Sequence, residues 1–278
     1  MTSSLVFPGY KLRELRFGGA VARYLEAGSG FPILLLHGVG PGTSCVGNFR
    51  FLLGPLSDRF HVFAMDLVGF GLSDRKPAPP YFDFDFWTRQ GQSLLDRMPA
   101  GPVGILGHSL SGAIALRLAG ANGRVAKVFT TGTVGTKYRL SSHLERLWTF
   151  PESRAELRAI LSTIIHDTSR ITDPILDERM EILTRGDYPA YFKAMFGPDK
   201  QKLMDSWALT QEELIRIKGR VLMLHGRNDL PCPAEETTLR LAPHLPSADI
   251  VLLGNCSHSP AVEYPDKLLA MAGSFFGE

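Results

Sequence analysis

The chain has 278 residues, of which 44% are hydrophobic, and its 30 Lys and Arg residues nearly balance its 28 Asp and Glu residues, for a formal net charge of +2. This length can bury one large core, or one core and a smaller inserted domain. The near-neutral balance, without a run of Lys and Arg, argues against a surface that binds nucleic acid or an anionic membrane, and it leaves small neutral or anionic ligands open.

The cysteines and the N-terminal segment bear on the compartment. Cys45, Cys232 and Cys256 are an odd, widely spaced set with no CxxC pair, which argues against a disulfide framework and against a structural zinc site. The segment Met1–Pro8 lacks a basic region followed by an apolar stretch, and no apolar run reaches the roughly 18 residues that a membrane span requires. We therefore expect a cytoplasmic protein without a membrane partner.

Short apolar runs recur with amphipathic stretches between them, which is the pattern of a mostly parallel sheet covered by helices. A leading hairpin is predicted from Leu12–Phe17 and Val21–Glu26, with its turn at Gly18-Gly19. The later predicted strands are Ile33–Leu36, His61–Met65, Val103–Leu106, Val125–Thr130, Val221–Leu224 and Ile250–Leu253. The predicted helices are Asn48–Leu56, Asp85–Met98, Ala113–Ala121, Ala234–Leu241 and Pro265–Phe276.

This alternation is interrupted between about residues 138 and 214. The interval has no strand-like runs, and helices are predicted in it at Pro151–Ile165, Pro174–Thr184 and Pro189–Met195. It is too long for a structureless loop in a compact domain. We therefore predict an α/β core from residues 1–137 and 215–278, with residues 138–214 inserted between two core strands as a helical cap.

The strand at Val103–Leu106 leads into Gly107-His108-Ser109-Leu110-Ser111-Gly112 and then into a helix. A serine at a sharp turn from strand to helix exposes its hydroxyl, and its neighbours must be small because the backbone there is strained. Ser111 stands where the second glycine of G-x-S-x-G is usual. Ser109 is therefore a candidate nucleophile, although this segment alone is equally compatible with a serine that only caps the helix.

A serine nucleophile requires a base within hydrogen-bond reach and an acid to orient that base. Asp229 follows the strand at Val221–Leu224, and His258 follows the strand at Ile250–Leu253, at the strand ends where open α/β sheets place their sites. Each residue alone is more typical of a structural position. Their joint occurrence in the order Ser109, Asp229, His258 favours a catalytic triad, since this is the order of α/β-hydrolases.

The loop His37-Gly38-Val39-Gly40-Pro41-Gly42 follows another predicted strand. Its glycines let backbone N–H groups approach a bound carbonyl, so Val39 and Leu110 are the candidate oxyanion donors. The loop lacks the Lys-Ser/Thr of a P-loop and a complete G-x-G-x-x-G pattern. The remaining histidines, including His143 and His166 in the insertion, where we expect them to be exposed, lack metal-ligand spacing. We expect neither a cofactor nor a metal.

These residues resemble the α/β-hydrolases over about Phe31–Gly112 and Val221–Pro265. Within that family, the loop from His37 to Gly42 followed by Asn48-Phe49 is similar to the meta-cleavage-product hydrolases, bacterial enzymes that cut a carbon–carbon bond in ring-opened aromatic compounds. The segment Ile171-Thr172-Asp173-Pro174-Ile175-Leu176-Asp177-Glu178-Arg179 is similar to their cap. The resemblance implies an α/β-hydrolase fold with a mostly parallel sheet, flanking helices and an inserted helical cap.

The resemblance also implies substrate-binding residues. In that family an arginine matching Arg179 binds the substrate's carboxylate, and a tryptophan matching Trp207 lines the cavity. Without the resemblance, Arg179 is more typical of a solvated residue in the charged cluster Asp177-Glu178-Arg179. The implied substrate-binding residues also include Gly38 and Gly40 of the glycine loop, Asn48 of the family-like stretch, and His108 beside Ser109.

The implied substrate is a vinylogous 1,5-diketone with a 2-hydroxy-dienoate end. Arg179 would hold its carboxylate in bidentate fashion, and His258 would move protons to form a keto tautomer. Ser109 would then attack the remote ketone, with Val39 and Leu110 stabilising the oxyanion, and the carbon fragment would leave as a dienolate. Water would hydrolyse the acyl-enzyme.

Other functions stay open. A carboxylesterase or lactonase would use the same triad, and it is favoured by His108 and Ser259, where the meta-cleavage-product hydrolases carry asparagine and tryptophan. A non-catalytic ligand-binding homologue and a cofactor-free oxygenase share the fold. The expected partner is a small molecule, a carboxylate-bearing dienol or diketone, and not a nucleic acid. A homodimer is compatible with the resemblance, although the sequence identifies no interface.

Overall fold

A computed structural model describes residues 5–245 and 247–278, so part of Met1–Pro8, on which the expectation of no signal peptide rests, lies outside the described residues. The described strands are β1 (Lys11–Phe17), β2 (Ala20–Ala27), β3 (Pro32–Leu36), β4 (His61–Met65), β5 (Val103–His108), β6 (Val125–Thr131), β7 (Arg220–Gly226) and β8 (Ala248–Leu253). They form one sheet in the order β1-β2-β4-β3-β5-β6-β7-β8. The β1–β2 and β2–β4 pairs are antiparallel, and all others are parallel.

This sheet confirms the predicted α/β class and every predicted strand, most of them one or two residues longer than expected. The hairpin turn is at Gly18 and Gly19, whose φ angles are +58° and +80°. A side chain is strained at such angles, so glycine suits this turn.

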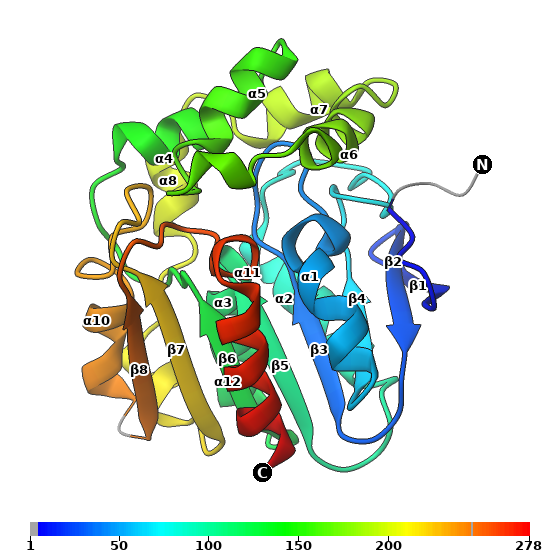
Figure 1. The fold of residues 1–278 in the computed structure, drawn as a ribbon, viewed down its shortest axis with the longest axis vertical. Coiled ribbons are helices and arrows are strands. Elements are labelled where there is room, and N and C mark those ends of the chain that lie inside the picture. The colour runs from blue at the N-terminus through cyan, green and yellow to red at the C-terminus, as the bar shows by residue number, and fades with distance from the viewer. Residues whose placement is uncertain (1–4, 246) are drawn as a thin grey trace.

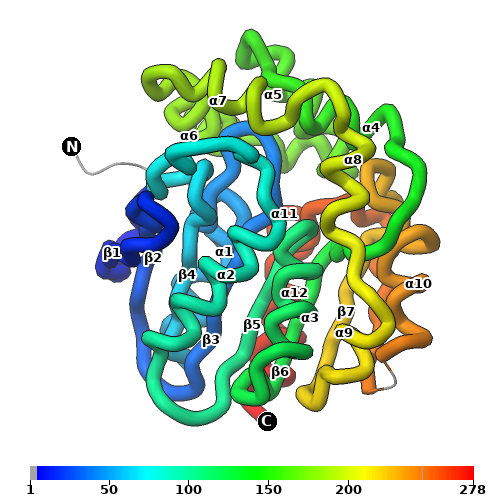
Figure 2. Tube along the Cα trace, turned by 180° about the vertical axis from the view of Figure 1, so that it is seen from behind, coloured from blue at the N-terminus to red at the C-terminus, as the bar shows by residue number. Residues whose placement is uncertain are grey.

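Helices cover both faces of the sheet. The described α-helices of the whole fold are α1 (Cys45–Ser57), α2 (Phe84–Leu95), α3 (Leu110–Ala121), α4 (Ser142–Leu147), α5 (Arg154–Leu161), α6 (Asp173–Leu183), α7 (Tyr188–Met195), α8 (Lys200–Asp205), α9 (Gln211–Ile215), α10 (Thr238–Leu241), α11 (Pro260–Glu263) and α12 (Pro265–Gly277). Helices α1, α11 and α12 lie on the near face in Figure 1, and α2, α3 and α9 lie on the opposite face in Figure 2.

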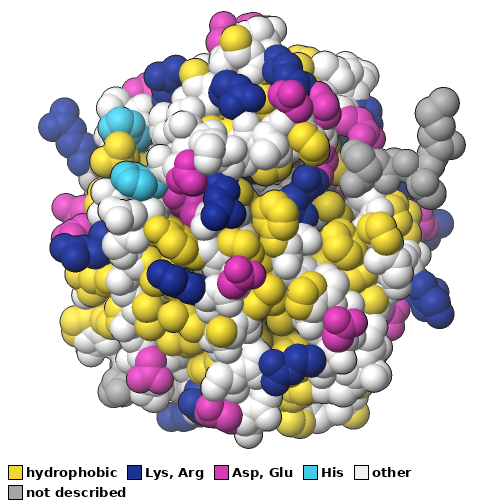
Figure 3. All heavy atoms as spheres, in the orientation of Figure 1, with side chains coloured by type: hydrophobic (Ala, Val, Ile, Leu, Met, Phe, Trp, Pro, Cys, Tyr) yellow, Lys and Arg dark blue, Asp and Glu magenta, His cyan; other side chains and the backbone are white. Residues whose placement is uncertain are grey.

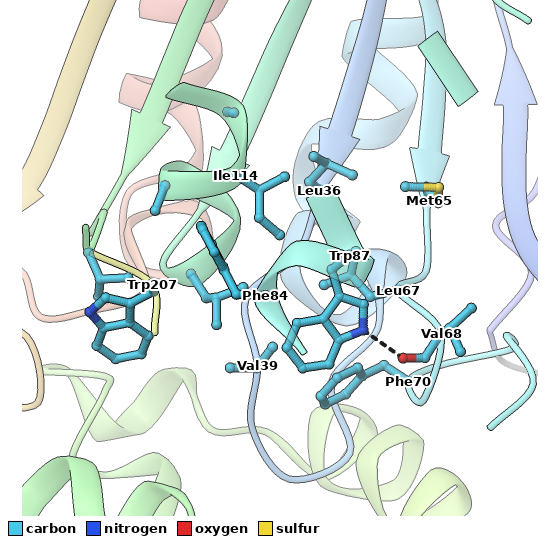
Figure 4. Packing of buried hydrophobic residues seen from close by; sticks show 14 of the residues in the cluster. Leu36, Val39, Met65, Leu67, Val68, Phe70, Phe84, Trp87, Ile114 and Trp207 are labelled. Carbon is cyan, nitrogen blue, oxygen red and sulfur yellow. Dashed lines mark hydrogen bonds between the residues drawn. The ribbon is translucent and has the colours of Figure 1, made fainter. Parts of the chain in front are cut away.

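The core has two halves because both faces of the sheet are buried. Successive side chains of a strand point to opposite faces. Accordingly, Leu34 and Leu36 of β3 belong to the apolar cluster that includes Trp87 of α2, and Ile33 and Leu35 belong to the cluster on the α1 and α12 side. In the first half, the Trp87 Nε1 atom donates a hydrogen bond to the Val68 carbonyl at 2.9 Å (Figure 4). The buried Trp87 is thus anchored to a loop beyond β4.

Helices α4 to α8 form a layer above the sheet (Figure 1). The predicted helical stretches of the insertion correspond to α5, α6 and α7, and α4 and α8 are additional short helices. Helix α9 packs against α3 on the sheet side, with Leu214 buried. The division into a core and a cap at residues 138–214 stays a proposal, and the position of α9 argues for ending the cap before that helix.

Two details differ from expectation. The helix predicted over Ala234–Leu241 begins only at Thr238, since Thr237 has non-helical angles of φ −124° and ψ −95° and residues 234–237 form turns. His143 is half-buried and not exposed, because it lies in α4, a helix that was not predicted, whereas His166 is exposed as expected.

Charged side chains of both signs are interspersed on the face shown in Figure 3, between areas of hydrophobic side chains. This pattern agrees with the near balance of acidic and basic residues in the sequence. Among the described residues, no helix is both long and apolar enough to cross a membrane.

Candidate active site

The structure brings the three candidate triad residues together from separate parts of the chain. Ser109 lies between β5 and α3, Asp229 follows β7, and His258 follows β8. The His258 Nε2 atom is 2.9 Å from the Ser109 Oγ atom, and the His258 Nδ1 atom is 2.6 Å from the Asp229 Oδ2 atom. All three are buried. This is the hydrogen-bonded geometry of an activated serine.

The backbone at Ser109 is strained in the way that displays a nucleophile. Its φ angle is +57° and its ψ angle −122°, a backbone region that residues other than glycine rarely adopt. A Cβ atom at Gly107 would collide with the Ser111 carbonyl, and one at Gly112 would collide with Thr133. The Ser109 side chain makes no capping hydrogen bond to α3, so the alternative of a serine that only caps the helix is wrong.

Ser111, the residue that departs from G-x-S-x-G, has a defined partner. Its hydroxyl donates a hydrogen bond to the His37 carbonyl. The bond joins the start of α3 to the loop after β3. Nothing in the sequence motif indicated this contact, because the partner is 74 positions away.

The electrostatics of Asp229 support its role as the triad acid. Burial alone would raise the pKa of its carboxyl, but the neighbouring His258 and His225 side chains hold that pKa well below its usual range. The His225 Nε2 atom is 2.9 Å from the Asp229 Oδ2 atom, and the Cys232 N–H donates to Oδ1 at 2.9 Å. The carboxylate is therefore ionised and held by several donors. Sequence reasoning missed His225, although it stands at the end of the same predicted strand.

The candidate oxyanion donors lie on the two turns that face Ser109. Among the described residues, neither the Val39 nor the Leu110 backbone N–H has a hydrogen-bond acceptor. A Cβ atom at Gly38 would come within 2.9 Å of the His108 ring and 3.0 Å of the Ser109 Cβ atom. The Gly38 N–H donates to the Asn48 Oδ1 atom at 2.8 Å. Asn48 therefore holds the loop that carries Val39, and glycine at 38 allows its close approach.

His108 packs directly on the base of the triad. Its ring centroid is 4.9 Å from that of His258, and its Nδ1 atom lies 3.1 Å from the Thr131 carbonyl, which can only accept a hydrogen bond. Burial, together with the neighbouring His258, lowers the pKa of His108 to about 3. His108 is therefore neutral at ordinary pH.

A small cavity lies at Ser109. Its lining includes these expected residues: Gly38, Val39, Gly40, Asn48, His108, Ser109, Arg179 and His258. It also includes Thr43, Leu147, Ile164 and Ser259, of which Leu147 and Ile164 are apolar cap residues that carried no signal in the sequence. Trp207 does not line this cavity. It is buried against Trp148, and its Nε1 atom donates to the Thr136 carbonyl at 3.1 Å, so the expected cavity position is not where the structure places it.

Arg179 reaches the cavity from α6. It is buried, with 7% of its surface exposed, and its Nη1 atom donates to the Pro41 carbonyl at 2.7 Å, while its Nε atom has no hydrogen-bond partner. Burial, together with the positive charge of Arg50, lowers the pKa of Arg179 to about 10. Arg179 thus carries a positive charge in the cavity that Ser109 also lines, and it is not the solvated helix residue of the alternative interpretation.

The neighbouring carboxylate does not neutralise Arg179. Glu178 is buried, forms an ion pair with Arg50 of α1, and accepts a hydrogen bond from the Ser44 hydroxyl at 3.1 Å. Within the described part of the chain, Arg179 has no ion pair with a carboxylate. A buried cation without a counter-ion is costly, so the cavity is suited to an anionic ligand.

Two of the candidate triad residues also belong to a group of side chains with the composition of a metal site. Ligand-type atoms of Asp229, Cys232 and His258 lie within 4.8 Å of one another. Burial raises the pKa of the Cys232 thiol well above its usual value, and a protonated thiol is a poor metal ligand. The Asp229 and His258 atoms are engaged with each other, so this group is better described as the triad and its surroundings.

Comparisons with known proteins identify the family of this chain. The model of the alpha/beta hydrolase family matches residues 33–271. A 2-hydroxymuconate semialdehyde hydrolase from Pseudomonas putida is 30% identical over 96% of this chain and 94% of its own length. A 2-hydroxy-6-oxo-2,4-heptadienoate hydrolase from another strain of that species is 29% identical over 95% of each chain.

Solved structures are similar over the same span. A meta-cleavage product hydrolase from Pseudomonas fluorescens superimposes with a TM-score of 0.89 at 28% identity, covering 95% of this chain and 97% of that chain. A 2-hydroxy-6-oxo-6-phenylhexa-2,4-dienoate hydrolase from a Rhodococcus strain gives 0.86 at 28% identity, covering 97% and 100%. The chain therefore belongs to the alpha/beta hydrolase family, with meta-cleavage product hydrolases among its relatives.

Proposed function

We propose that this chain is a serine-dependent hydrolase that cleaves a carbon–carbon bond in meta-ring-fission products of the 2-hydroxy-6-oxo-dienoate type. Relatives that match nearly the whole chain are named as hydrolases of 2-hydroxymuconate semialdehyde and of 2-hydroxy-6-oxo-2,4-heptadienoate. Both belong to this class of ring-fission product. The proposal assigns Ser109, Asp229 and His258 as nucleophile, acid and base, and Val39 and Leu110 as oxyanion donors.

The observation that carries the proposal is the buried guanidinium of Arg179, which has no carboxylate partner among the described residues and shares one cavity with Ser109 and His258. A guanidinium fork matches a carboxylate in bidentate geometry. A substrate with a carboxylate at one end would place its other end over Ser109. A simple neutral ester requires no such cation, so carboxylesterase and lactonase activities are less well supported.

The reaction follows from the positions of these groups. With the carboxylate on Arg179, His258 would move the proton of the 2-hydroxyl group to carbon and so form the keto tautomer. The Ser109 oxygen would then bond to the remote carbonyl carbon, and its proton would pass to His258. The oxyanion would receive hydrogen bonds from the Val39 and Leu110 N–H groups. When the carbon–carbon bond breaks, its electron pair would be delocalised into the dienolate, which would take the proton from His258. Water, with His258 again as the base, would then hydrolyse the remaining acyl-serine.

The proposal includes three further points: the role of the inserted segment, the compartment and the oligomeric state. Residues 138–214 would act as the cap, since Leu147, Ile164 and Arg179 line the cavity from that segment. A cytoplasmic location is supported by three buried, free cysteines. The homodimer stays a prediction from the resemblance alone.

The test compares two hydrolysis rates. One is the rate on a yellow ring-fission dienol, monitored by the loss of its colour, and the other is the rate on a neutral activated ester. We expect Arg179→Ala to weaken binding of the dienol by about 2 kcal/mol or more, because a charged bidentate contact is lost. Activity on the ester should fall much less. Arg179→Lys keeps the positive charge but not the two-pronged guanidinium, so its dienol binding should lie between that of the wild type and that of Arg179→Ala.

Ser109→Ala is the control for the nucleophile and should abolish both activities. A wild-type protein that hydrolyses esters at full rate but leaves every dienol coloured would reject the carbon–carbon assignment. Equal losses on dienol and ester in Arg179→Ala would reject the role of Arg179.

A further inference from the structure

The triad acid has a second histidine as its neighbour. The Asp229 Oδ2 atom lies 2.6 Å from the His258 Nδ1 atom and 2.9 Å from the His225 Nε2 atom. His225 is fully buried at the end of β7, so no water competes for this contact on its side. One carboxylate oxygen is therefore shared by two imidazole rings.

The partners of His225 determine where its hydrogen lies. Its Nε2 atom faces the Asp229 carboxylate and also the Cys232 carbonyl at 2.8 Å. Both partners can only accept, so Nε2 must carry the hydrogen. The Nδ1 atom is 2.7 Å from the Thr238 hydroxyl at the start of α10, which can supply the matching hydrogen bond. His225 is thus a fixed donor toward Asp229.

The contact constrains the rotation of the Asp229 carboxylate. The Cys232 backbone N–H holds Oδ1 at 2.9 Å, and the His225 Nε2 atom holds Oδ2 at 2.9 Å. A carboxylate with donors on both oxygens cannot turn about its Cβ–Cγ bond without leaving a buried group unpaired. The Oδ2 atom is consequently kept in the direction of His258.

We propose that His225 is a positioning residue for catalysis, which holds the Asp229 carboxylate in the orientation that keeps His258 directed at Ser109. Positioning of Asp229 by His225 matters most when His258 has taken the Ser109 proton, because Asp229 must then stabilise the imidazolium without rotating. The inference rests on the proposed triad but not on the carbon–carbon substrate. It therefore extends to any acyl transfer at Ser109.

Two substitutions at His225 separate the donor from the space that the ring fills. The amide nitrogen of glutamine is as many bonds from Cα as Nε2 of histidine, so His225→Gln retains a donor toward Asp229. The amide nitrogen of asparagine corresponds to Nδ1, which faces Thr238, so His225→Asn loses that donor. Both variants introduce the same polar group and remove the ring.

Steady-state hydrolysis of a neutral activated ester is the assay, and the full-length chain is used throughout. We expect His225→Asn to lower kcat by about tenfold or more, as for a lost hydrogen bond to a charged group, with KM within about twofold of the wild type. His225→Gln should recover most of kcat. Thermal unfolding of both variants is measured so that the comparison is made between folded proteins.

Equal kcat values for His225→Asn and the wild type, or for His225→Asn and His225→Gln, would overturn the inference. If His225→Asn does not fold, His225→Leu, which fills the buried space without a donor, takes its place under the same expectation. A wild-type protein that neither turns over the ester nor is labelled at Ser109 by a fluorophosphonate would instead reject the proposed triad, so the two failures are distinguishable.

Discussion

At the scale of single residues, Ser111 shows how a departure from a motif can be compensated. The residue adds a Cβ and a hydroxyl where glycine is usual in G-x-S-x-G, and its hydroxyl donates to the His37 carbonyl. His37 immediately precedes the loop of Val39, and Ser111 immediately follows Leu110. The hydrogen bond therefore joins the two backbone segments that would have to act together on an oxyanion.

We predict that Ser111→Ala lowers kcat on an activated ester by about tenfold and leaves KM nearly unchanged, because the two oxyanion donors are less firmly held relative to each other. The free energy of unfolding should also fall by about 1–2 kcal/mol, since the buried His37 carbonyl loses its donor. Stopped-flow acylation and urea unfolding measure the two effects.

Ser162→Ala is a matched control, because the Ser162 hydroxyl also donates to a backbone carbonyl, that of Arg158, but lies exposed on the cap. It should change neither quantity appreciably. An unaltered acylation rate in Ser111→Ala would show that the link is only structural.

At the scale of elements, α6 is seated closely on the loop after β3. A Cβ atom at Gly42 would come within 2.5 Å of the Arg179 carbonyl, and one at Gly47 within 2.8 Å of the Glu178 carboxylate. The ion pair of Glu178 with Arg50 joins the same helix to α1. These contacts fix the height of α6 above the sheet and with it the position of the Arg179 guanidinium.

We predict that Gly42→Ala raises KM for an anionic dienol more than it changes kcat, because the added methyl group displaces α6 and Arg179. Gly42 has a φ angle of +61°, so the substitution also strains the backbone by about 1 kcal/mol. Steady-state kinetics and thermal unfolding are the measurements.

Gly101→Ala separates strain from displacement. Gly101 also has a positive φ angle, +100°, but no atom lies within 4 Å of the position of an added Cβ. It should lose stability without a change in KM. A KM that is equally unaffected in Gly42→Ala would show that α6 adapts to the methyl group.

The accuracy of the sequence predictions depended on the length and burial of each element. Strand β4 was predicted with its observed bounds, His61–Met65, because apolar runs of this length are buried on both faces. Helices α4 and α8 have only six residues each, and a helix of fewer than two turns shows no clear period. Missing α4 meant missing Leu147 as a cavity residue.

Long-range side-chain partners were beyond the sequence. The triad was predicted because its members follow strands in a fixed order, and strand ends meet at one edge of a parallel sheet. By contrast, the contacts of Glu178 with Arg50 and of Ser111 with His37 join elements 128 and 74 positions apart, and no periodicity encodes them. Trp207 was placed in the cavity by resemblance alone, and its burial against Trp148 depends on how the cap packs.

At the scale of the whole molecule, the site lies between two layers, the sheet and the helices above it. The sheet supplies Ser109, Asp229 and His258 from the ends of parallel strands, whereas α6 in the helical layer above it supplies Arg179. Chemistry and recognition of an anion are thereby assigned to different layers. This division explains how the proposed roles of the triad and of Arg179 can be tested independently, by one neutral and one anionic substrate.

Three buried titratable groups predict how the stability of the molecule depends on pH. Burial lowers the pKa of His37 to about 4 and that of His108 to about 3, so between these values and about 6.5 the unfolded chain binds two protons that the folded chain does not. Burial raises the pKa of Asp66 to about 6, so below that pH the folded chain binds one proton that the unfolded chain lacks. Because the unfolded state gains one proton in the balance of these three groups, their combined contribution lowers stability as pH falls from 6.5 to 4.5.

We predict a decrease of about 1 kcal/mol per pH unit over this interval, measured by urea unfolding. His108→Asn tests the cause, since the asparagine amide occupies the place of Nδ1 and can still donate to the Thr131 carbonyl, but it does not titrate. As pH falls, protonation of His37 in the unfolded chain lowers stability and protonation of Asp66 in the folded chain raises it. These two effects oppose each other, so the stability of this variant should be nearly independent of pH between 6.5 and 4.5. An unchanged slope in His108→Asn would mean that protonation of His108 is not linked to unfolding, and the acid sensitivity would then have to come from other groups.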